Sequence, residues 1–231
     1  KFMAWIDFYD SAPSIYVSDA HRQAHFNLIA DDIIGYIASP EATVLDYSCG
    51  EAMSANRVAA KCSRLILAEP APSVRARLAD RFAAVPNIEA LSPDDLTALP
   101  DASLDLIVMI SVAQYMTPED LDAAFVQFRR LLKPDGRFVL GDILDPDVGA
   151  VTDAAALLKF AAKNGFLIDA VTGITRMALS NYRSLRHQIG LYSYRTDDML
   201  RKLADAGFAA TLAPRNVGTN PARKTFVARP R

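Results

Sequence analysis

The chain has 231 residues, of which 51% are hydrophobic and 23% charged, a composition typical of a folded globular protein. Its 25 basic and 27 acidic residues give a formal charge of −2, which argues against the broad basic surface of a nucleic-acid-binding protein. Two cysteines are too few for a disulfide framework or a four-cysteine metal site, so we expect a reducing, cytoplasmic location. The 10 glycines are few for a protein that holds phosphate in a glycine-rich loop.

Neither a signal peptide nor a membrane-spanning helix is expected. The first ten residues alternate aromatic, apolar and acidic side chains, without the apolar core of a signal peptide. Region 154–179 is apolar on average, but charged side chains interrupt it, among them Lys163 and Asp169. A spanning helix needs about 20 nearly uncharged residues, which no segment supplies.

The first predicted element is a helix over residues 19–38, with apolar residues at helical spacing and Ser18 or Asp19 as its N-cap. Strands and helices then alternate as far as residue 143. The predicted strands are 43–48, 64–69, 87–92, 104–110 and 137–143, and the helices between them are 52–61, 73–84 and a third from Thr117 to Leu132. Pro118 and two acids favour the start of that third helix, and Pro134-Asp135-Gly136 ends it.

The alternation stops after residue 143. Residues 144–195 contain helical pieces and no clear strand. Thr196 then caps a helix that ends near Gly207, and two short strands follow at 208–213 and 224–228. Because the loop between them is too short for a helical crossover, these two strands are predicted to pair antiparallel.

These elements predict an α/β protein with a Rossmann-like, doubly wound, mostly parallel sheet of seven strands and an antiparallel last strand. We expect one domain over residues 1–231. Its parts are an N-terminal helix and lid (1–40), a cofactor-binding core (43–143), a helical substrate cover (144–195) and a final helix with an antiparallel hairpin (196–231). In such sheets the ligand lies beyond the carboxyl ends of the strands.

The end of the first strand indicates which kind of ligand fits. Neither a G-x-G-x-x-G nor a G-x-x-x-x-G-K pattern is present, and Asp46 occupies the first turn of the loop, where a carboxylate would repel phosphate. An acid there suits an adenosine that carries an ammonium and a sulfonium, as S-adenosylmethionine does. Glu69, 19 residues after Gly50, is placed to bind ribose hydroxyls; its alternative role is a solvated or helix-capping acid.

Four segments together resemble a known family. VLDYSCGEA (44–52), LILAEP (65–70), SPDDLTALPDASLDLIVMISVAQYM (92–116) and LLKPDGRFVLGDI (131–143) are similar to the class I S-adenosylmethionine-dependent methyltransferases, closest to the small-molecule group of ubiquinone- and menaquinone-type enzymes. The resemblance covers residues 43–143 and the closing hairpin. It implies transfer of a methyl group from S-adenosylmethionine to a small molecule, with S-adenosylhomocysteine as product.

The resemblance also implies which residues bind the cofactor. It places the methionine and ribose along the first strand end, the ribose hydroxyls at the second, the adenine after the third and the methionine amino group after the fourth. The cofactor-binding positions carried over are Asp46, Ser48, Gly50, Glu69, Pro70, Asp94, Asp95, Leu96, Ile110, Ser111 and Gln114. Gln114 and Tyr115 would face the transferred methyl group or the substrate.

Ser48 departs from the family pattern, which has glycine there. Glycine lets the backbone approach the cofactor and tolerates a positive φ, so we expect serine to fit only with a negative φ. Weaker cofactor binding, or a lost activity, is the consequence to test. The alternative function is therefore a catalytically inactive methyltransferase fold that serves as a binding or assembly module.

His21, His25 and Tyr115 are the candidate catalytic residues. Methyl transfer requires mainly that donor and acceptor be held in line, and a base is needed only if the acceptor keeps a proton. His21 and His25 lie four apart and share a helix face, which fits a base or substrate contacts, or an exposed face next to Arg22. A metal site would need a third ligand, and we expect none.

The aromatic residues outside the core favour an apolar or aromatic substrate. Tyr9 and Tyr16 either close over the sulfonium or pack the N-terminal arm. Region 144–195 carries Phe160, Phe166, Met177, Tyr182, Tyr192 and Tyr194, with Arg176, Arg183, Arg186 and His187 among them. The basic group either meets an anionic substrate or forms a solvated face, and the region is also able to contact a membrane surface or a partner subunit, so a homodimer is possible.

Two other enzyme classes fit less well. A nicotinamide-dependent reductase would need the missing pyrophosphate loop. A protein or nucleic-acid methyltransferase is disfavoured by the charge balance and by the absence of an N-P-P-Y-type motif after the fourth strand.

Overall fold

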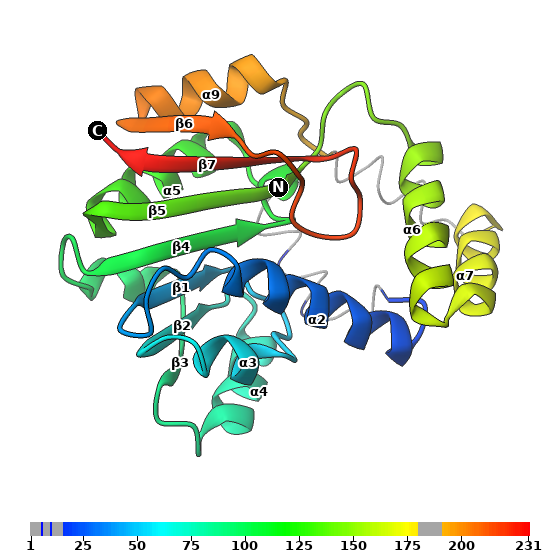
Figure 1. Ribbon diagram of the computed structural model, residues 1–231, viewed down its shortest axis with the longest axis horizontal. Coiled ribbons are helices and arrows are strands. Elements are labelled where there is room, and N and C mark those ends of the chain that lie inside the picture. Colours follow the sequence, from blue (N-terminus) through cyan, green and yellow to red (C-terminus); the bar gives the residue numbers. More distant parts are fainter. Residues whose placement is uncertain (1–5, 7–9, 11–15, 180–190) are drawn as a thin grey trace.

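The computed structural model describes residues 6, 10, 16–179 and 191–231. A seven-stranded sheet in the order β3-β2-β1-β4-β5-β7-β6 forms its centre (Figure 1). The strands are β1 (Thr43–Tyr47), β2 (Arg64–Ala68), β3 (Ile88–Leu91), β4 (Leu104–Ile110), β5 (Leu132–Ile143), β6 (Phe208–Leu212) and β7 (Lys224–Pro230). The first five are parallel, and β7 lies antiparallel between β5 and β6. The predicted Rossmann-like sheet with an antiparallel last strand is confirmed.

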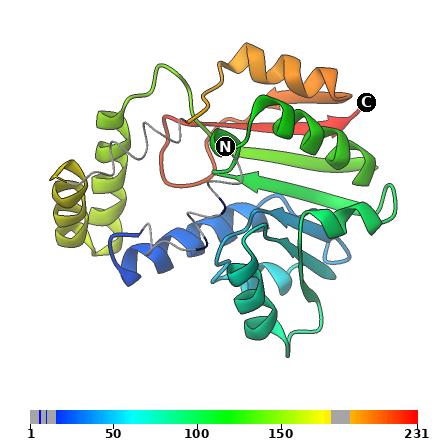
Figure 2. The ribbon, with the colours of Figure 1, turned by 180° about the vertical axis from the view of Figure 1, so that it is seen from behind.

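Helices cover both faces of the sheet. One face carries α2 (Asp19–Ile34), α3 (Ala55–Ala59) and α4 (Pro72–Phe82), and the other carries α5 (Pro118–Leu131) and α9 (Thr196–Asp205), which Figure 2 shows from behind. Two short 3₁₀ helices, η1 (Asp94–Ala98) and η2 (Ala113–Tyr115), follow β3 and β4. The near-continuous apolar sequence of the strands follows from this burial on both sides.

The core is divided by the sheet into two layers. Successive side chains of a strand point to opposite faces, so Leu45 and Ile107 pack with α5 and α9, while Val44 and Leu106 pack with the α2–α4 layer. All four side chains have at most 1% of their surface exposed. Each strand is therefore locked in register by both layers, which holds the strand ends in place.

The helix starts follow ordinary capping chemistry. The Ser18 hydroxyl accepts a hydrogen bond from the amide of His21, as expected for the predicted N-cap. The Thr117 hydroxyl likewise accepts from the amide of Asp120, and Pro118 follows at the first helical position. These caps fix where α2 and α5 begin.

Several predicted boundaries are wrong. The helices predicted over 19–38 and 52–61 are shorter, at Asp19–Ile34 and Ala55–Ala59, and two elements begin elsewhere than predicted. β5 begins at Leu132, not at residue 137, because Leu132 already pairs with Leu104; the register then shifts, and Pro134-Asp135-Gly136 lies inside the strand. Thr196 is the first residue of α9 rather than its cap. Its hydroxyl instead accepts a hydrogen bond from Lys224 Nζ at 2.7 Å, which ties the start of α9 to β7.

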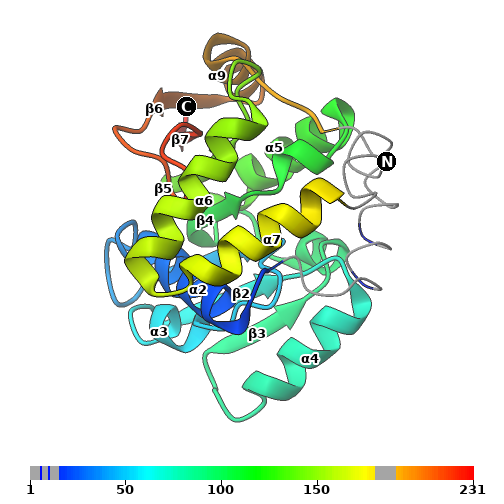
Figure 3. The ribbon, with the colours of Figure 1, turned by 90° about the vertical axis from the view of Figure 1, so that its right-hand side faces the viewer.

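The predicted cover region contains two helices, α6 (Ala150–Asn164) and α7 (Leu167–Leu179), joined at Gly165 in a left-handed conformation. They form a hairpin beyond the carboxyl edge of the parallel strands, as Figure 3 shows. Phe166 is buried inside the hairpin, where Val17 and Ala24 of the N-terminal part pack against the same small cluster. Among the described residues no helix combines the length and apolar character needed to cross a bilayer.

A buried carboxylate joins α2 to the loop between β6 and β7. Asp32 is 2% exposed, and its Oδ2 accepts a hydrogen bond of 2.7 Å from the amide of Gly218. Its other oxygen pairs with Arg215 at 2.7 Å. Gly218 has a φ of +93°, a conformation that glycine adopts without strain. The loop is thereby held over the carboxyl edge of the sheet, next to α2.

Candidate active site

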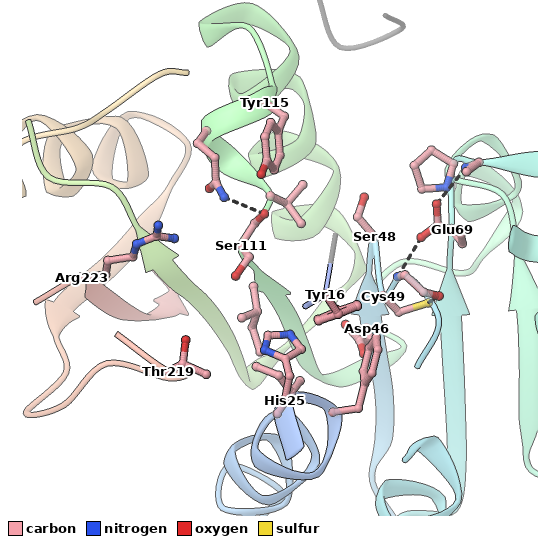
Figure 4. A pocket seen from close by; sticks show the side chains of 18 of the residues that line it. Tyr16, His25, Asp46, Ser48, Cys49, Glu69, Ser111, Tyr115, Thr219 and Arg223 are labelled. Atoms are coloured by element: carbon pink, nitrogen blue, oxygen red, sulfur yellow. Dashed lines mark hydrogen bonds between the residues drawn. The ribbon is translucent and has the colours of Figure 1, made fainter. Parts of the chain in front are cut away.

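A cavity of about 320 Å³ lies at the carboxyl ends of β1, β2 and β4, where the fold class predicts a ligand. The helices α2 and α6 and the β6–β7 loop complete its wall (Figure 4). Of the sequence-predicted residues, those that line it are Tyr16, His21, His25, Asp46, Ser48, Gly50, Glu69, Pro70, Ile110, Ser111, Gln114 and Tyr115. Four segments distant in sequence, around residues 16–25, 46–50, 69–70 and 110–115, therefore meet at one site.

Glu69 is held firmly at the end of β2. It is 2% exposed, and its two carboxylate oxygens each accept a backbone hydrogen bond of 2.8 Å, from Gly50 and from Ala71. Burial raises its pKa, and the two backbone bonds oppose that rise. Since each carboxylate oxygen has a second lone pair, Glu69 keeps acceptor capacity for hydroxyl groups in the cavity.

Asp46 lies in the strand β1 itself, not in the turn after it as predicted. Burial raises its pKa to about 7, and the neighbouring Glu69 carboxylate adds to the rise. Two carboxyl groups thus share one side of the cavity with no described cation between them. Cys49, half-buried on the same side, is a free thiol whose pKa burial also raises.

Ser48 contradicts the expected negative φ. Its φ is +57°, so serine occupies the left-handed conformation that the family pattern gives to glycine. Its hydroxyl oxygen is buried and has no hydrogen-bond partner among the described residues. Ser111 and Asp142, near the ends of β4 and β5, share this conformation, with φ of +61° and +60°. The three central strands therefore each end in strained backbone beside the cavity.

A hydrogen-bonded turn follows β4. The hydroxyl of Ser111 donates to Asp142 Oδ2 at 2.6 Å, and Gln114 Nε2 donates to the carbonyl of Ser111 at 2.8 Å. Gln114 is only 3% exposed, and its Oε1 has no partner within the described part of the chain. An unpaired acceptor at a cavity wall is a position where a ligand donor fits.

Of the residues predicted to flank adenine, Asp94 lines a second cavity, of about 780 Å³, whereas Asp95 and Leu96 do not. Pro70 lines both cavities and Asp94 lines the second, so the two are neighbours. The Asp95 carboxylate, inside η1, accepts from the amide and the hydroxyl of Ser92, which precedes η1. Leu96 has 0% exposure and packs in the core.

The two histidines have different surroundings. The His21 ring stacks on Phe166, with centroids 5.0 Å apart, and its Nδ1 accepts from the amide of Val17 at 3.3 Å. His25 makes ring contact with Tyr16 at 5.4 Å and no side-chain hydrogen bond to another described residue. Burial lowers the pKa of His25 to about 4, although the nearby Asp142 carboxylate opposes this. Its imidazole is therefore neutral at pH 7.

Sequence reasoning missed Arg223 and Thr219, which the β6–β7 loop brings into the cavity. Arg223 Nη1 donates to Asp142 Oδ2 at 2.7 Å, and Nη2 donates to Asp153 of α6 at 3.1 Å. The side chains of this Asp142–Arg223–Asp153 group are 9%, 16% and 21% exposed. The length of this loop predicts only that its two strands pair antiparallel. No sequence motif around Arg223 indicates a role in the cavity.

Some predicted residues lie outside the described part. These are Tyr9, Tyr182, Arg183, Arg186 and His187, together with the side chains of Arg176 and Met177. Tyr194, which is described, is buried in the core rather than at the cavity. The described residues contain no cluster of His, Cys, Asp and Glu suited to a metal ion.

Comparison with known proteins gives one matching family and several similar solved structures. Residues 45–140 match the family described as "Methyltransferase domain". No curated protein sequence matches the chain. The solved structure of YcgJ from Bacillus subtilis is 18% identical and aligns over 81% of this chain and 70% of its own, with a TM-score of 0.56.

Two further structures align over 100% of this chain and 97% of their own at 14% identity. One is magnesium protoporphyrin IX methyltransferase from Synechocystis with bound S-adenosylmethionine, with a TM-score of 0.59. The other belongs to the complex between a Haloferax volcanii methyltransferase activator and a putative methyltransferase, with a TM-score of 0.60. At these identities the likeness establishes the fold.

Proposed function

Because residues 45–140 of this chain form a domain of the methyltransferase family on the class I fold, we propose that it transfers a methyl group from S-adenosylmethionine to a small molecule. The observation that carries this proposal is the cavity with Asp46, Ser48 and Gly50 on one wall and Glu69 beside them. The product of the cofactor is S-adenosylhomocysteine.

The polar atoms of the cavity fit this cofactor. Buried Ser48 Oγ and Gln114 Oε1 lack partners among the described residues, and Asp46 and Glu69 supply carboxylates. Hydrogen-bond acceptors of this kind suit the ammonium group and the ribose hydroxyls. Pro70 and Asp94, at the second cavity, are our candidates for the adenine, and Asp95 and Leu96 follow Asp94 in the chain. Ile110 and Ser111 lie toward the methionine part.

The cofactor, when bound, supplies a methyl carbon activated by its sulfonium. The residues of this chain then have to hold the acceptor in line and keep water away. His25 is our candidate for the base: its neutral ring takes the proton that the acceptor atom loses as the new bond forms. The Asp142 carboxylate stabilises the resulting imidazolium, since its charge favours the protonated ring. His21 and Tyr115 are proposed to contact the acceptor.

The alternative, an inactive fold used as a binding or assembly module, rests on the strain at Ser48. The cavity beside Ser48 is open in the structure, with a volume of about 320 Å³, rather than filled by its side chain. We therefore favour the enzyme. A cytoplasmic location, an apolar or aromatic substrate and a possible homodimer remain parts of the proposal.

Calorimetric titration with S-adenosylhomocysteine tests the cofactor site. We expect the wild-type chain to bind with a measurable heat, and Glu69→Ala to lose binding because the ribose hydroxyls lose their acceptor. Glu41→Ala, an exposed acid outside the cavity, serves as the matched control and should bind like wild type. Thermal unfolding of each variant confirms that it is folded. Absence of heat with the folded wild-type chain at millimolar ligand would refute the proposed function.

A further inference from the structure

The cavity has a second half that faces away from Glu69. In Figure 4, Arg223 and Thr219 lie on the side of the cavity opposite Glu69 and Cys49, with Ser111 and His25 between the two sides. Leu157 of α6 and Phe26 of α2 add apolar surface to the wall. We call Thr219, His25, Arg223 and Leu157 the acceptor subsite. If the cofactor occupies the carboxylate side, as proposed above, this half remains for the substrate.

The ion pairs of Arg223 determine which charge a substrate can carry in the acceptor subsite. Arg223 is the only cationic side chain among the described residues that line the cavity. Both of its terminal nitrogens already donate to carboxylates, Nη1 to Asp142 and Nη2 to Asp153. The two carboxylates outnumber the guanidinium, so the group carries a net negative charge and would repel an anionic substrate group placed beside it. Burial of an unpaired negative charge there is strongly unfavourable. Arg223 Nε, which has no hydrogen-bond partner among the described residues, can still donate to an uncharged oxygen.

The reaction itself requires that the attacking atom carry no positive charge at the moment of transfer. The atom that attacks the methyl group needs a free lone pair, which a protonated amine lacks. A positive group would also be repelled by the sulfonium that it approaches. The acceptor subsite therefore suits an uncharged group.

The polar atoms that remain in the acceptor subsite match a hydroxyl group. The Thr219 side chain is half-buried and makes no hydrogen bond to another described residue, and the neutral His25 ring likewise has none. A threonine hydroxyl both donates and accepts, while a neutral imidazole accepts at one nitrogen. A substrate hydroxyl can thus accept from Thr219 and donate its proton to His25. Leu157 and Phe26 provide apolar contact for the carbon body.

We propose that the acceptor subsite binds an uncharged hydroxyl compound with an apolar body, and that Thr219 on the β6–β7 loop and His25 on α2 select it. In the transfer, the substrate oxygen forms a bond to the methyl carbon as the carbon–sulfur bond breaks. The electron pair of that bond stays on sulfur, and the hydroxyl proton moves to His25 and then to water. The inference rests on the proposed function of the same cavity.

The test measures, by saturation-transfer NMR, the binding of small fragments to the chain saturated with S-adenosylhomocysteine. Benzyl alcohol and benzoate are the probes, because they share the aromatic body and differ in charge. We expect benzyl alcohol to bind and benzoate to bind at least tenfold more weakly. Thr219→Val, which keeps the shape and removes the hydroxyl, should weaken benzyl alcohol about fivefold. Thr211→Val on the exposed strand β6 is the matched control and should leave both affinities unchanged.

A second variant tests the pairing of Arg223. Asp153→Asn removes one counter-charge from the guanidinium, so benzoate should gain about tenfold in affinity while benzyl alcohol changes little. Benzoate binding to the wild-type chain as tightly as benzyl alcohol would overturn the proposal. So would the failure of benzyl alcohol to bind, or an unchanged affinity in Thr219→Val. These outcomes differ from a failure of the proposed function, in which S-adenosylhomocysteine itself would not bind.

Discussion

The two halves of the cavity are built in different ways. The cofactor half is formed by the ends of β1 and β2, where Glu69 accepts backbone hydrogen bonds from Gly50 and Ala71. The acceptor half is formed by side chains from α2, α6 and the β6–β7 loop, with a largely buried ion group in which Arg223 joins Asp142 to Asp153. The first half is thus held by the sheet and its main chain, and the second by side-chain charge.

This difference separates what each half contributes. Strand ends are positioned by the whole sheet, so the cofactor half belongs to the fold. The acceptor half depends on a few ion pairs between α6, the β6–β7 loop and β5, which are able to change without altering the sheet. Substitutions in the two halves should therefore affect different measurements, in the following order of size.

Arg223→Met should have the largest effect, on stability. Removing the guanidinium leaves the buried Asp142 and the partly buried Asp153 without this partner, which costs about 3–5 kcal/mol in the free energy of unfolding. Urea denaturation measures the loss. Arg195→Met breaks an exposed pair with Asp147, in which the side chains are 64% and 72% exposed, and should change stability by less than about 1 kcal/mol. Equal effects of the two substitutions would contradict a charge-held acceptor half.

His25→Ala should lower kcat about 100-fold, because the acceptor proton loses its base. The affinity for S-adenosylhomocysteine should stay within twofold of wild type, since His25 belongs to the acceptor half. Radiolabelled methyl transfer and calorimetry give the two values. Since burial lowers the pKa of His25 to about 4, the wild-type kcat should be flat above pH 5. A rate unchanged by the substitution would remove His25 from the mechanism.

Cofactor affinity should depend on pH through Asp46. Burial and the neighbouring Glu69 raise the pKa of Asp46 to about 7, so in the empty cavity the Asp46 carboxyl group is protonated below that pH. A cationic ligand favours the carboxylate, so binding below pH 7 requires proton release. The Kd of S-adenosylhomocysteine should therefore fall about tenfold between pH 6 and pH 8.

Asp46→Asn should abolish the pH dependence of the Kd. A wild-type Kd that stays constant between pH 6 and pH 8 would contradict the assigned role of Asp46. The free energy of unfolding of the empty protein changes with pH in the opposite direction. The raised pKa means that the folded chain retains a proton that the unfolded chain loses, so stability declines as pH rises from about 4 to about 7.

Ser48→Gly should have the smallest effect. It relieves the left-handed φ of +57°, so the free energy of unfolding should rise by about 0.5–1 kcal/mol once the greater freedom of glycine in the unfolded chain is subtracted. The melting temperature should increase by about 2 °C. Ala83→Gly, at a right-handed φ of −52°, is the matched control and should lower stability. A destabilised Ser48→Gly would mean that the hydroxyl stabilises the empty chain.

The sequence predicted most of the fold and the cofactor half for the same reason. Apolar runs such as Leu104–Ile110 define strands locally, and Asp46 and Glu69 follow from strand ends. In the acceptor half His25 was predicted, but Arg223 and Thr219 were missed because the contacts of their loop are distant in sequence: Asp142 and Arg223 are 81 residues apart. The φ of Ser48 was also mispredicted, because sheet packing overrides the local preference of serine.

The contact of Asp32 with Gly218 has a mechanical consequence for the acceptor half. His25 lies on the same helix as Asp32, and Thr219 directly follows Gly218, so one buried hydrogen bond of 2.7 Å couples the two substrate-facing elements. Loss of this hydrogen bond should therefore loosen the positions of His25 and Thr219 relative to each other. The separation of His25 and Thr219, and with it the size of acceptor that fits, thus depends on Asp32, which does not line the cavity.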